Sequence, residues 1–132
     1  MPKETVYLSG SIDGHKNLDK AKQWRNKAQN ILTEHGFNVI NPLQDFGKIE
    51  NLTPKKVYEN SINSALACDI MLVEMTHSHV SYVGTSCEML KAYENGAKII
   101  LWGNANRGSY FLWHICDVWL DSLTKALRYL TY

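Results

Sequence analysis

Short runs of β-branched, aromatic and aliphatic residues alternate along this chain with longer segments of helical periodicity. The expected strands are Thr5–Ser9, Phe37–Asn41, Asp69–Glu74, Lys98–Trp102 and a short one around Cys116–Trp119. The expected helices cover residues 17–34, 53–67, 84–95 and 121–130. Strands that alternate with helices through short links predict parallel βαβ units. The fold class is therefore α/β, a three-layer sandwich with a parallel sheet of about five strands.

Several residues mark where the expected helices begin and end. Thr53 precedes Pro54, which places an N-cap residue before proline at the first helical position. Gly36 and Gly96 follow two of the expected helices and are suited to end them. Residues 42–53 are polar and aperiodic, and residues 75–83 are rich in histidine and serine, so both predict loops.

Three of the expected loops follow strands and therefore belong to one edge of the sheet. They are residues 10–16, 41–53 and 75–88. Parallel α/β folds bind ligands outside the carboxyl ends of their strands. We expect these three loops to meet there and form the ligand site.

Length and composition limit the classes of function. The 132 residues suffice for a single domain, 1–132, and the formal net charge of +1 gives no support to binding of a nucleic acid polymer. The N-terminus lacks the apolar segment of a signal peptide, and no stretch approaches the roughly 20 apolar residues of a membrane span. We expect a soluble cytoplasmic protein that does not interact with membranes.

The cysteines and histidines do not form a metal-binding pattern. Cys68, Cys87 and Cys116 are widely spaced and contain no CxxC pair, which argues against a disulfide scaffold and a zinc site. His77 and His79 are two residues apart, but no third ligand is near them in the sequence. We expect no metal.

Glu88 is the leading candidate for a catalytic residue. It follows Gly84-Thr85-Ser86-Cys87, near the start of a helix that begins at the expected ligand edge. A carboxylate there is stabilised by the helix N-terminus and could attack the anomeric carbon of a sugar. Glutamate is also common in first helical turns for electrostatic reasons alone, so its position does not decide between the two interpretations.

Three other residues with titratable side chains are candidates for a role at the ligand site. Asp69 opens the third strand, where it could cap the preceding helix, orient a loop or face a ligand. Glu74 ends the same strand, and its carboxylate is expected to reach the ligand site. Tyr7 could hold Glu88 through its phenol, or it could be an ordinary core tyrosine.

The segment from Gly10 to Lys16 is the expected binding loop for an anion or for the 5′ side of a ribose. It combines glycines, a serine and backbone N–H groups near a helix start. It matches neither the GxGxxG pattern nor the P-loop pattern, and Asp13 would repel a phosphate.

Four motifs, in order along the chain, together resemble the nucleoside 2-deoxyribosyltransferase family. They are Tyr7–Ser11, Asn41–Leu43, Ala67–Leu72 and Gly84–Glu88. The resemblance implies a flavodoxin-like fold, Glu88 as the nucleophile, Tyr7 as its supporting residue and no cofactor. Members of the family exchange the base of a 2′-deoxynucleoside through a covalent deoxyribosyl-enzyme.

A neighbouring branch of the family, which hydrolyses nucleoside 5′-monophosphates, is also similar. Its Gly-Ser-Ile-x-Gly loop is reproduced by Gly10–Gly14, although Asp13 stands where that branch can have an arginine for phosphate. Ser109 matches the serine that the branch inserts into the active site of a neighbouring subunit. The resemblance therefore implies a homo-oligomer whose active sites are shared across the interface.

Two positions depart from the family pattern. Tyr82 stands where the transferases have an aspartate that positions the sugar, and Ser61 stands where many have an aspartate that recognises the base. Tyr132 matches the terminal tyrosine of the transferases. The residues expected to bind substrate are Ser9, Gly10, Ser11, Asp13, Gly14, Pro42, Ser61, Asp69, Tyr82, Gly84, Ser109 and Tyr132.

We therefore expect an enzyme that cleaves the N-glycosidic bond of a (deoxy)nucleoside and passes the sugar from Glu88 to another base. A 5′-monophosphate N-glycosidase that uses water as the acceptor is the alternative. An inactive nucleotide-sensing domain is a further alternative, which the substitution at Tyr82 favours. The small-molecule partners would be a nucleoside or its monophosphate and a nucleobase.

Overall fold

Five parallel strands form the centre of the computed structural model, which describes residues 3–13, 15 and 17–132. The strands are β1 (Thr5–Ser9), β2 (Asn38–Ile40), β3 (Ile70–Glu74), β4 (Lys98–Trp102) and β5 (Val118–Leu120). The helices are α1 (Asp19–Glu34), α2 (Pro42–Asp45), η1 (Ile49–Asn51), α3 (Pro54–Ala67), α4 (Val83–Glu94), α5 (Tyr110–Ile115) and α6 (Leu123–Thr131). The strand order β2-β1-β3-β4-β5 confirms the predicted flavodoxin-like arrangement.

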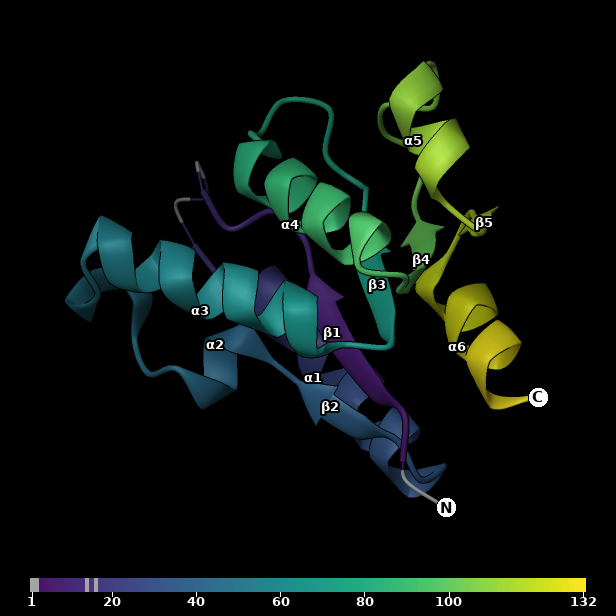
Figure 1. Cartoon of the computed structure of the whole chain (residues 1–132), viewed down its shortest axis with the longest axis horizontal. Helices are drawn as coiled ribbons and strands as arrows, with labels where there is room; N and C mark the ends of the chain where they lie inside the picture. Colours follow the sequence, from purple (N-terminus) through teal and green to yellow (C-terminus); the bar gives the residue numbers. More distant parts are fainter. Residues whose placement is uncertain (1–2, 14, 16) are drawn as a thin grey trace.

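Helices cover both faces of the sheet, which makes three layers. α1 and α6 lie on one face, and α3 and α4 lie on the other (Figure 1). Side chains alternate along each strand. In β1, Val6 and Leu8 pack in the core beneath α1, whereas Tyr7 packs in the core beneath α3 and α4. Tyr7 is thereby directed to the same side of the sheet as Glu88.

The strand register brings the carboxyl ends of β1 and β3 side by side. Ser9 pairs with Val73, and the next strand places Trp102 opposite Glu74. The loops after these strands therefore leave the sheet at the same edge, as the sequence predicts.

Two segments are more regular than expected. Residues 42–53 contain α2 and η1, because the Asn41 side chain accepts a hydrogen bond from Leu43 N and Pro42 occupies the first turn. The part of the chain between β4 and β5 contains α5, whose N-cap is Ser109, and β5 begins slightly later than expected. These short helices depend on single capping contacts and leave no periodic signal in the sequence.

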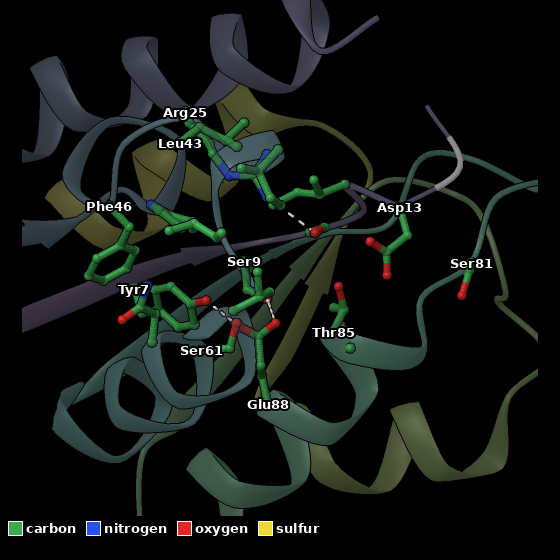
Figure 2. Close-up of a pocket in the computed structure, with 18 of the residues that line it drawn as sticks. Tyr7, Ser9, Asp13, Arg25, Leu43, Phe46, Ser61, Ser81, Thr85 and Glu88 are labelled. Carbon is green, nitrogen blue, oxygen red and sulfur yellow. Dashed lines mark hydrogen bonds between the residues drawn. The ribbon is translucent and has the colours of Figure 1, made fainter. Parts of the chain in front are cut away.

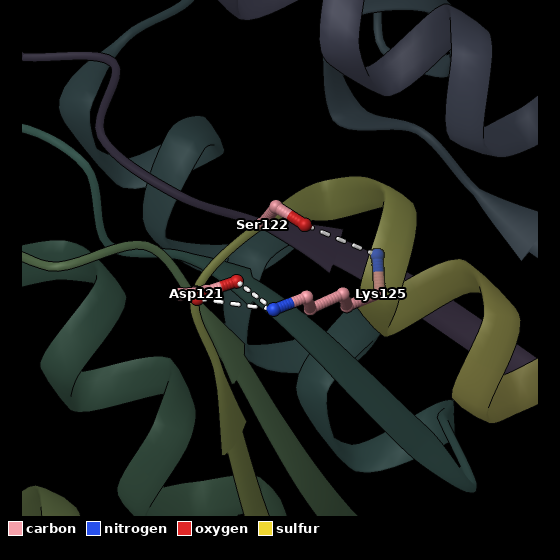
Figure 3. A network of polar contacts seen from close by, with 3 residues as sticks. All are labelled: Asp121, Ser122 and Lys125. Carbon is pink, nitrogen blue, oxygen red and sulfur yellow. Dashed lines mark hydrogen bonds and ion pairs between the residues drawn. The ribbon is translucent and has the colours of Figure 1, made fainter.

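A short polar network lies at the start of the last helix, α6. The Ser122 hydroxyl accepts a hydrogen bond from Lys125 N at 3.2 Å, and Lys125 Nζ lies 3.1 Å from Asp121 Oδ1 (Figure 3). Both charged side chains are exposed, so this pair adds little to stability. No helix in the described part of the chain has the length and hydrophobicity that a membrane span requires.

Candidate active site

A cavity of about 680 Å³ opens at the carboxyl edge of β1 and contains most of the expected site residues. Its walls come from β1 and the loop after it, from the α2–η1 segment, and from the first turns of α4 and the middle of α3. The expected residues that line it are Tyr7, Ser9, Gly10, Asp13, Pro42, Ser61, Gly84 and Glu88. Three of the four family-like motifs thus meet in one place.

Glu88 projects from α4 toward the end of β1 and is 6% exposed. The Tyr7 hydroxyl donates a hydrogen bond to its Oε2, and the Ser9 hydroxyl donates one to its Oε1 at 3.0 Å (Figure 2). The two donors occupy alternate positions of β1, so both project from the same face of the sheet. They fix the carboxylate at the cavity wall.

Burial, rather than the helix N-terminus, dominates the electrostatics of Glu88. Burial raises the pKa of this carboxyl, and hydrogen bonds from Tyr7, Ser9 and Ser61 and the charge of Arg25 oppose the rise without cancelling it. α4 begins at Val83, so Glu88 lies in the second turn, where the helix dipole has largely faded. The sequence-based expectation of stabilisation by the helix start is corrected accordingly.

Tyr7 is a hydrogen-bond donor to Glu88 at any ordinary pH. Burial, together with the negative charge of Glu88, raises the pKa of its phenol well above the usual value. The phenol therefore keeps its proton and points it at the carboxylate. The other carboxylate oxygen, Glu88 Oε1, accepts a hydrogen bond from a weaker donor, the Ser9 hydroxyl.

The cavity has a polar end and an apolar end. Asp13, Ser81 and Thr85 direct their side-chain oxygens to the polar end, beside Glu88 (Figure 2). The apolar end is formed by Leu43, Phe46, Ile49, Leu52 and Val57, with Asn60 and Ser61 as its polar groups. A ligand that carries a flat apolar ring on a hydroxylated body fits this division.

Arg25 also lines the cavity, and sequence reasoning missed it. It lies on α1 with 0% exposure, next to the core residues Trp24 and Ala28. One feature of the sequence could have identified it: Arg25 is a charged residue on the apolar face of an amphipathic helix. Charged residues are almost never buried without a specific partner.

Glu74 was expected to reach the ligand, and the structure corrects this. Its Oε1 accepts hydrogen bonds from Ser11 N and Ser11 Oγ, and its Oε2 accepts them from Thr76 and from the Tyr82 hydroxyl at 2.6 Å. Burial raises its pKa, but these hydrogen bonds outweigh burial and bring the pKa below the ordinary value. Glu74 ties two loops to the sheet and does not line the cavity.

Ser11 and Tyr82 were expected to bind substrate and are likewise outside the cavity wall. The Tyr82 hydroxyl also accepts hydrogen bonds from Thr76 N and His77 N, so its binding capacity is used within the loop. Ser11 Oγ bonds to Glu74 and to His15 Nε2. Their assignment as substrate ligands is corrected, because both side chains are committed to the Glu74 network.

The remaining expected ligands fall elsewhere. Asp69 lies at the opposite edge of the sheet, where it accepts a hydrogen bond from Thr5 N at 2.8 Å, so its assignment to the ligand site is wrong. Ser109 caps α5 and Tyr132 ends the chain beside α1, both away from the cavity of their own chain. Gly14 lies outside the described residues.

The described residues contain no group of three or more histidine, cysteine, aspartate or glutamate side chains arranged to hold a metal ion. Cys68, Cys87 and Cys116 are free thiols.

Solved structures with the same fold include enzymes that act on N-glycosidic bonds. A CMP N-glycosidase from Clostridium botulinum, BcmB, has a TM-score of 0.66 at 19% identity, and the match covers 96% of this chain and 97% of that one. A 2-deoxyribosyltransferase from Bacillus psychrosaccharolyticus has a TM-score of 0.69 at 17% identity, covering 95% and 91%. A conserved protein from Enterococcus faecalis V583 has a TM-score of 0.73 at 12% identity, covering 96% of both chains.

Models of known families do not match this sequence, and no curated protein matches it significantly. At identities below 20%, the structural matches establish a shared fold over nearly the whole chain. The fold is that of the family suggested by the sequence motifs.

Proposed function

We propose that this protein is an N-glycosyl transferase of the nucleoside 2-deoxyribosyltransferase type, with Glu88 as its nucleophile. The observation that carries the proposal is the buried Glu88 carboxylate, held by Tyr7 and Ser9 at the wall of a cavity. A buried carboxylate with a raised pKa in a cavity is a common mark of a catalytic group. The shared fold with a 2-deoxyribosyltransferase and a CMP N-glycosidase supports the same class of reaction.

The proposed reaction has two displacement steps at the anomeric carbon. First, a Glu88 oxygen forms a bond to C1′ as the C1′–N bond breaks, and the base leaves with the electron pair and takes up a proton. Second, the nitrogen of another base attacks C1′ and loses a proton, and Glu88 leaves as a carboxylate. The Tyr7 hydroxyl keeps one Glu88 oxygen engaged, so the other is presented to the sugar.

The two ends of the cavity suggest how a nucleoside would lie. Its base would lie among the apolar residues, where the Phe46 ring offers a stacking surface and Asn60 and Ser61 offer hydrogen bonds. Its sugar would lie at Glu88, and its 5′ side would lie near Gly10 and Asp13. The side-chain amide of Asn60 has both hydrogen-bond donors and an acceptor, so it could form hydrogen bonds with several different bases.

The charge at the polar end supports a nucleoside without a 5′-phosphate. Asp13 would repel a phosphate, and among the described residues Arg25 is the one basic side chain that lines the cavity. The Arg25 guanidinium is already bonded to three backbone carbonyls. The Gly10–Gly14 loop motif favours the alternative function, a 5′-monophosphate N-glycosidase that uses water as the acceptor.

An oligomer with shared sites is also part of the proposal. A groove between α4 and α5, of about 1420 Å³, is lined by Cys87, Leu90, Ser109 and Phe111 among others. Phe111 is 85% exposed and Leu90 is 51% exposed, which is unusual for apolar side chains that border one groove. Burial of this surface against a second copy would carry Ser109 toward the neighbouring cavity.

Sedimentation measurements test the oligomer. The proposal predicts a dimer or larger assembly, and Phe111→Asp is expected to dissociate it and to reduce activity together with assembly. A fully active monomer would contradict this part of the proposal.

Incubation with a 2′-deoxynucleoside and a second free base tests the reaction itself. The proposal predicts a new nucleoside, whereas free sugar with no new nucleoside would favour the N-glycosidase. The panel of substrates includes 5′-monophosphates. The control for a substitution of Glu88 is Glu94→Ala, which removes an exposed glutamate from the same helix, α4. No release of base from any member of the panel, with ligand-dependent stabilisation of the fold, would favour a sensor and reject the enzyme.

A further inference from the structure

Arg25 is the most deeply buried charged side chain in the described part of the chain, with 0% exposure. Its Nε donates to Leu8 O at 3.4 Å, its Nη1 to Ala21 O at 3.1 Å and its Nη2 to Gly10 O at 3.2 Å. The guanidinium also lies 4.7 Å from the centre of the Trp24 ring. All three hydrogen-bond acceptors are neutral, so none of them balances the positive charge.

No carboxylate in the described part of the chain lies within ion-pair distance of Arg25. A buried charge without a direct partner is strongly unfavourable, and an apolar side chain would normally be favoured at such a position. The nearest source of compensation is the pair of buried carboxylates, Glu74 and Glu88, whose charges act on Arg25 through space. The titratable groups facing this region are Tyr7, Asp13, Glu74 and Glu88.

The positive charge of Arg25 survives its burial. Burial lowers its pKa to about 10, and its electrostatic interactions with Tyr7, Glu74 and Glu88 oppose the decrease. Arg25 in turn lowers the pKa of Glu88, against the larger effect of burial on that carboxyl. Both carboxylates interact with Arg25 through space, but Glu74 also accepts five hydrogen bonds, whereas Glu88, which lines the cavity, accepts two.

Arg25 also holds the wall of the cavity next to Glu88. A Cβ atom at Gly10 would lie 2.9 Å from Glu74 Cβ and 3.3 Å from Trp24 Cζ2, so the Gly10 backbone is closely packed between β3 and α1. The bond from Arg25 Nη2 to Gly10 O fixes this backbone from the α1 side. Arg25 therefore joins α1 to the turn after β1, and its charge also acts on the Glu88 carboxylate.

We propose that Arg25 is a positioning residue for the reaction at Glu88: it fixes the Gly10 turn and supplies a buried positive charge that favours the ionised form of Glu88. This inference rests on the proposed role of Glu88 as nucleophile. The charge and the hydrogen-bond fork are separable, because lysine retains the first and loses most of the second.

Titration of the Glu88 carboxyl by ¹³C NMR, with the pH profile of kcat, tests the inference. Arg25→Met is expected to raise the Glu88 pKa and to move the acid limb of the profile to higher pH. Arg25→Lys is expected to keep both near the wild-type values, with a rise in KM from the loosened turn. Lys22→Met removes an exposed cation from the same helix and is expected to leave both unchanged.

A purely structural role predicts a different pattern, in which methionine and lysine variants lose stability alike and the Glu88 pKa does not move. That result would overturn the inference. If Arg25→Met does not fold, Arg25→Lys decides alone, because a Glu88 pKa raised by lysine as well would reject the charge-based role. The NMR titration needs no turnover, so an inactive wild-type protein would reject the proposed function without deciding the role of Arg25.

Discussion

Glu74 and Glu88 are both buried near the carboxyl edge of the sheet, but their surroundings differ. Glu74 accepts five hydrogen bonds, from Ser11, Thr76 and Tyr82, and its pKa is lowered although burial alone would raise it. Glu88 is bonded to Tyr7 and Ser9, lines the cavity, and has a pKa that burial raises. The number of donors around each carboxylate distinguishes Glu74 from Glu88, the proposed nucleophile.

This difference has a general physical basis. A carboxylate whose lone pairs are all occupied is stabilised in its charged form and is a poor nucleophile, because attack would break those hydrogen bonds. A buried carboxylate with few hydrogen-bond donors has a desolvation penalty that is only partly offset. A bond to an electrophilic carbon neutralises its charge and removes that penalty. Substitutions at the two positions should therefore have opposite consequences.

The largest expected effect is the loss of activity in Glu88→Gln. The amide cannot form the glycosyl ester, so base release should fall by at least about 10³-fold with the fold intact. Initial-rate assays with circular dichroism as the folding control measure this. Glu74→Gln, matched in chemistry and burial, should retain activity to within about tenfold, and an equal loss in both variants would break the comparison.

The stability of the fold, unlike the activity, should decrease when Glu74 is substituted. Glu74→Gln removes charged hydrogen bonds to three residues, and the free energy of unfolding should fall by about 2 kcal/mol. The lowered pKa of Glu74 means that its contribution is present above the unfolded value, about pH 4.3, and is lost as the pH falls through the folded value. Urea unfolding at pH 7 and at low pH measures the difference, which should shrink in acid.

Tyr7→Phe should reduce activity by about 30-fold, with Tyr82→Phe as its matched control. Both phenols donate to a buried glutamate, but Tyr7 bonds to Glu88 and Tyr82 bonds to Glu74. Loss of the Tyr7 donor removes the contact that positions the carboxylate for attack, and a loss of roughly 2 kcal/mol of transition-state stabilisation appears in kcat. Tyr82→Phe should lower thermal stability and leave kcat nearly unchanged; the reverse pattern would show that the two networks have been assigned the wrong roles.

The smallest expected effect is a gain of stability in Glu88→Gln. The folded pKa of Glu88 is raised, so its protonated form is favoured by folding, and ionisation costs stability as the pH rises through that value. Glutamine has no such cost, so the variant should be more stable than wild type at pH 7 by about 1 kcal/mol and no more stable at pH 3. Equal stability at both pH values would contradict the raised pKa.

The fold was predictable because its signals are local. The apolar run at Asp69–Glu74, the periodicity of residues 17–34 and the Thr53-Pro54 start each depend on neighbouring residues, and each element forms close to its expected bounds. The α2 and α5 helices were missed because they are too short to show a period.

The site was predictable only in part, because its contacts are distant in sequence. Tyr7 and Glu88 are 81 residues apart, and the family-like motifs were the signal that joined them. No motif marks the bonds between Ser11 and Glu74, 63 residues apart, or the burial of Arg25. Asp69 was misassigned because a position at the start of a strand points to the edge opposite the ligand site.

Mass spectrometry of the protein after incubation with a 2′-fluoro-2′-deoxynucleoside tests the central claim most directly. The fluorine slows the second displacement more than the first, so the glycosyl-enzyme should accumulate. The account predicts a mass increase equal to one fluorinated sugar, located on Glu88 by peptide mapping and absent from Glu88→Gln. Release of base without any adduct, or an adduct on another residue, would contradict the assignment of Glu88 as the nucleophile.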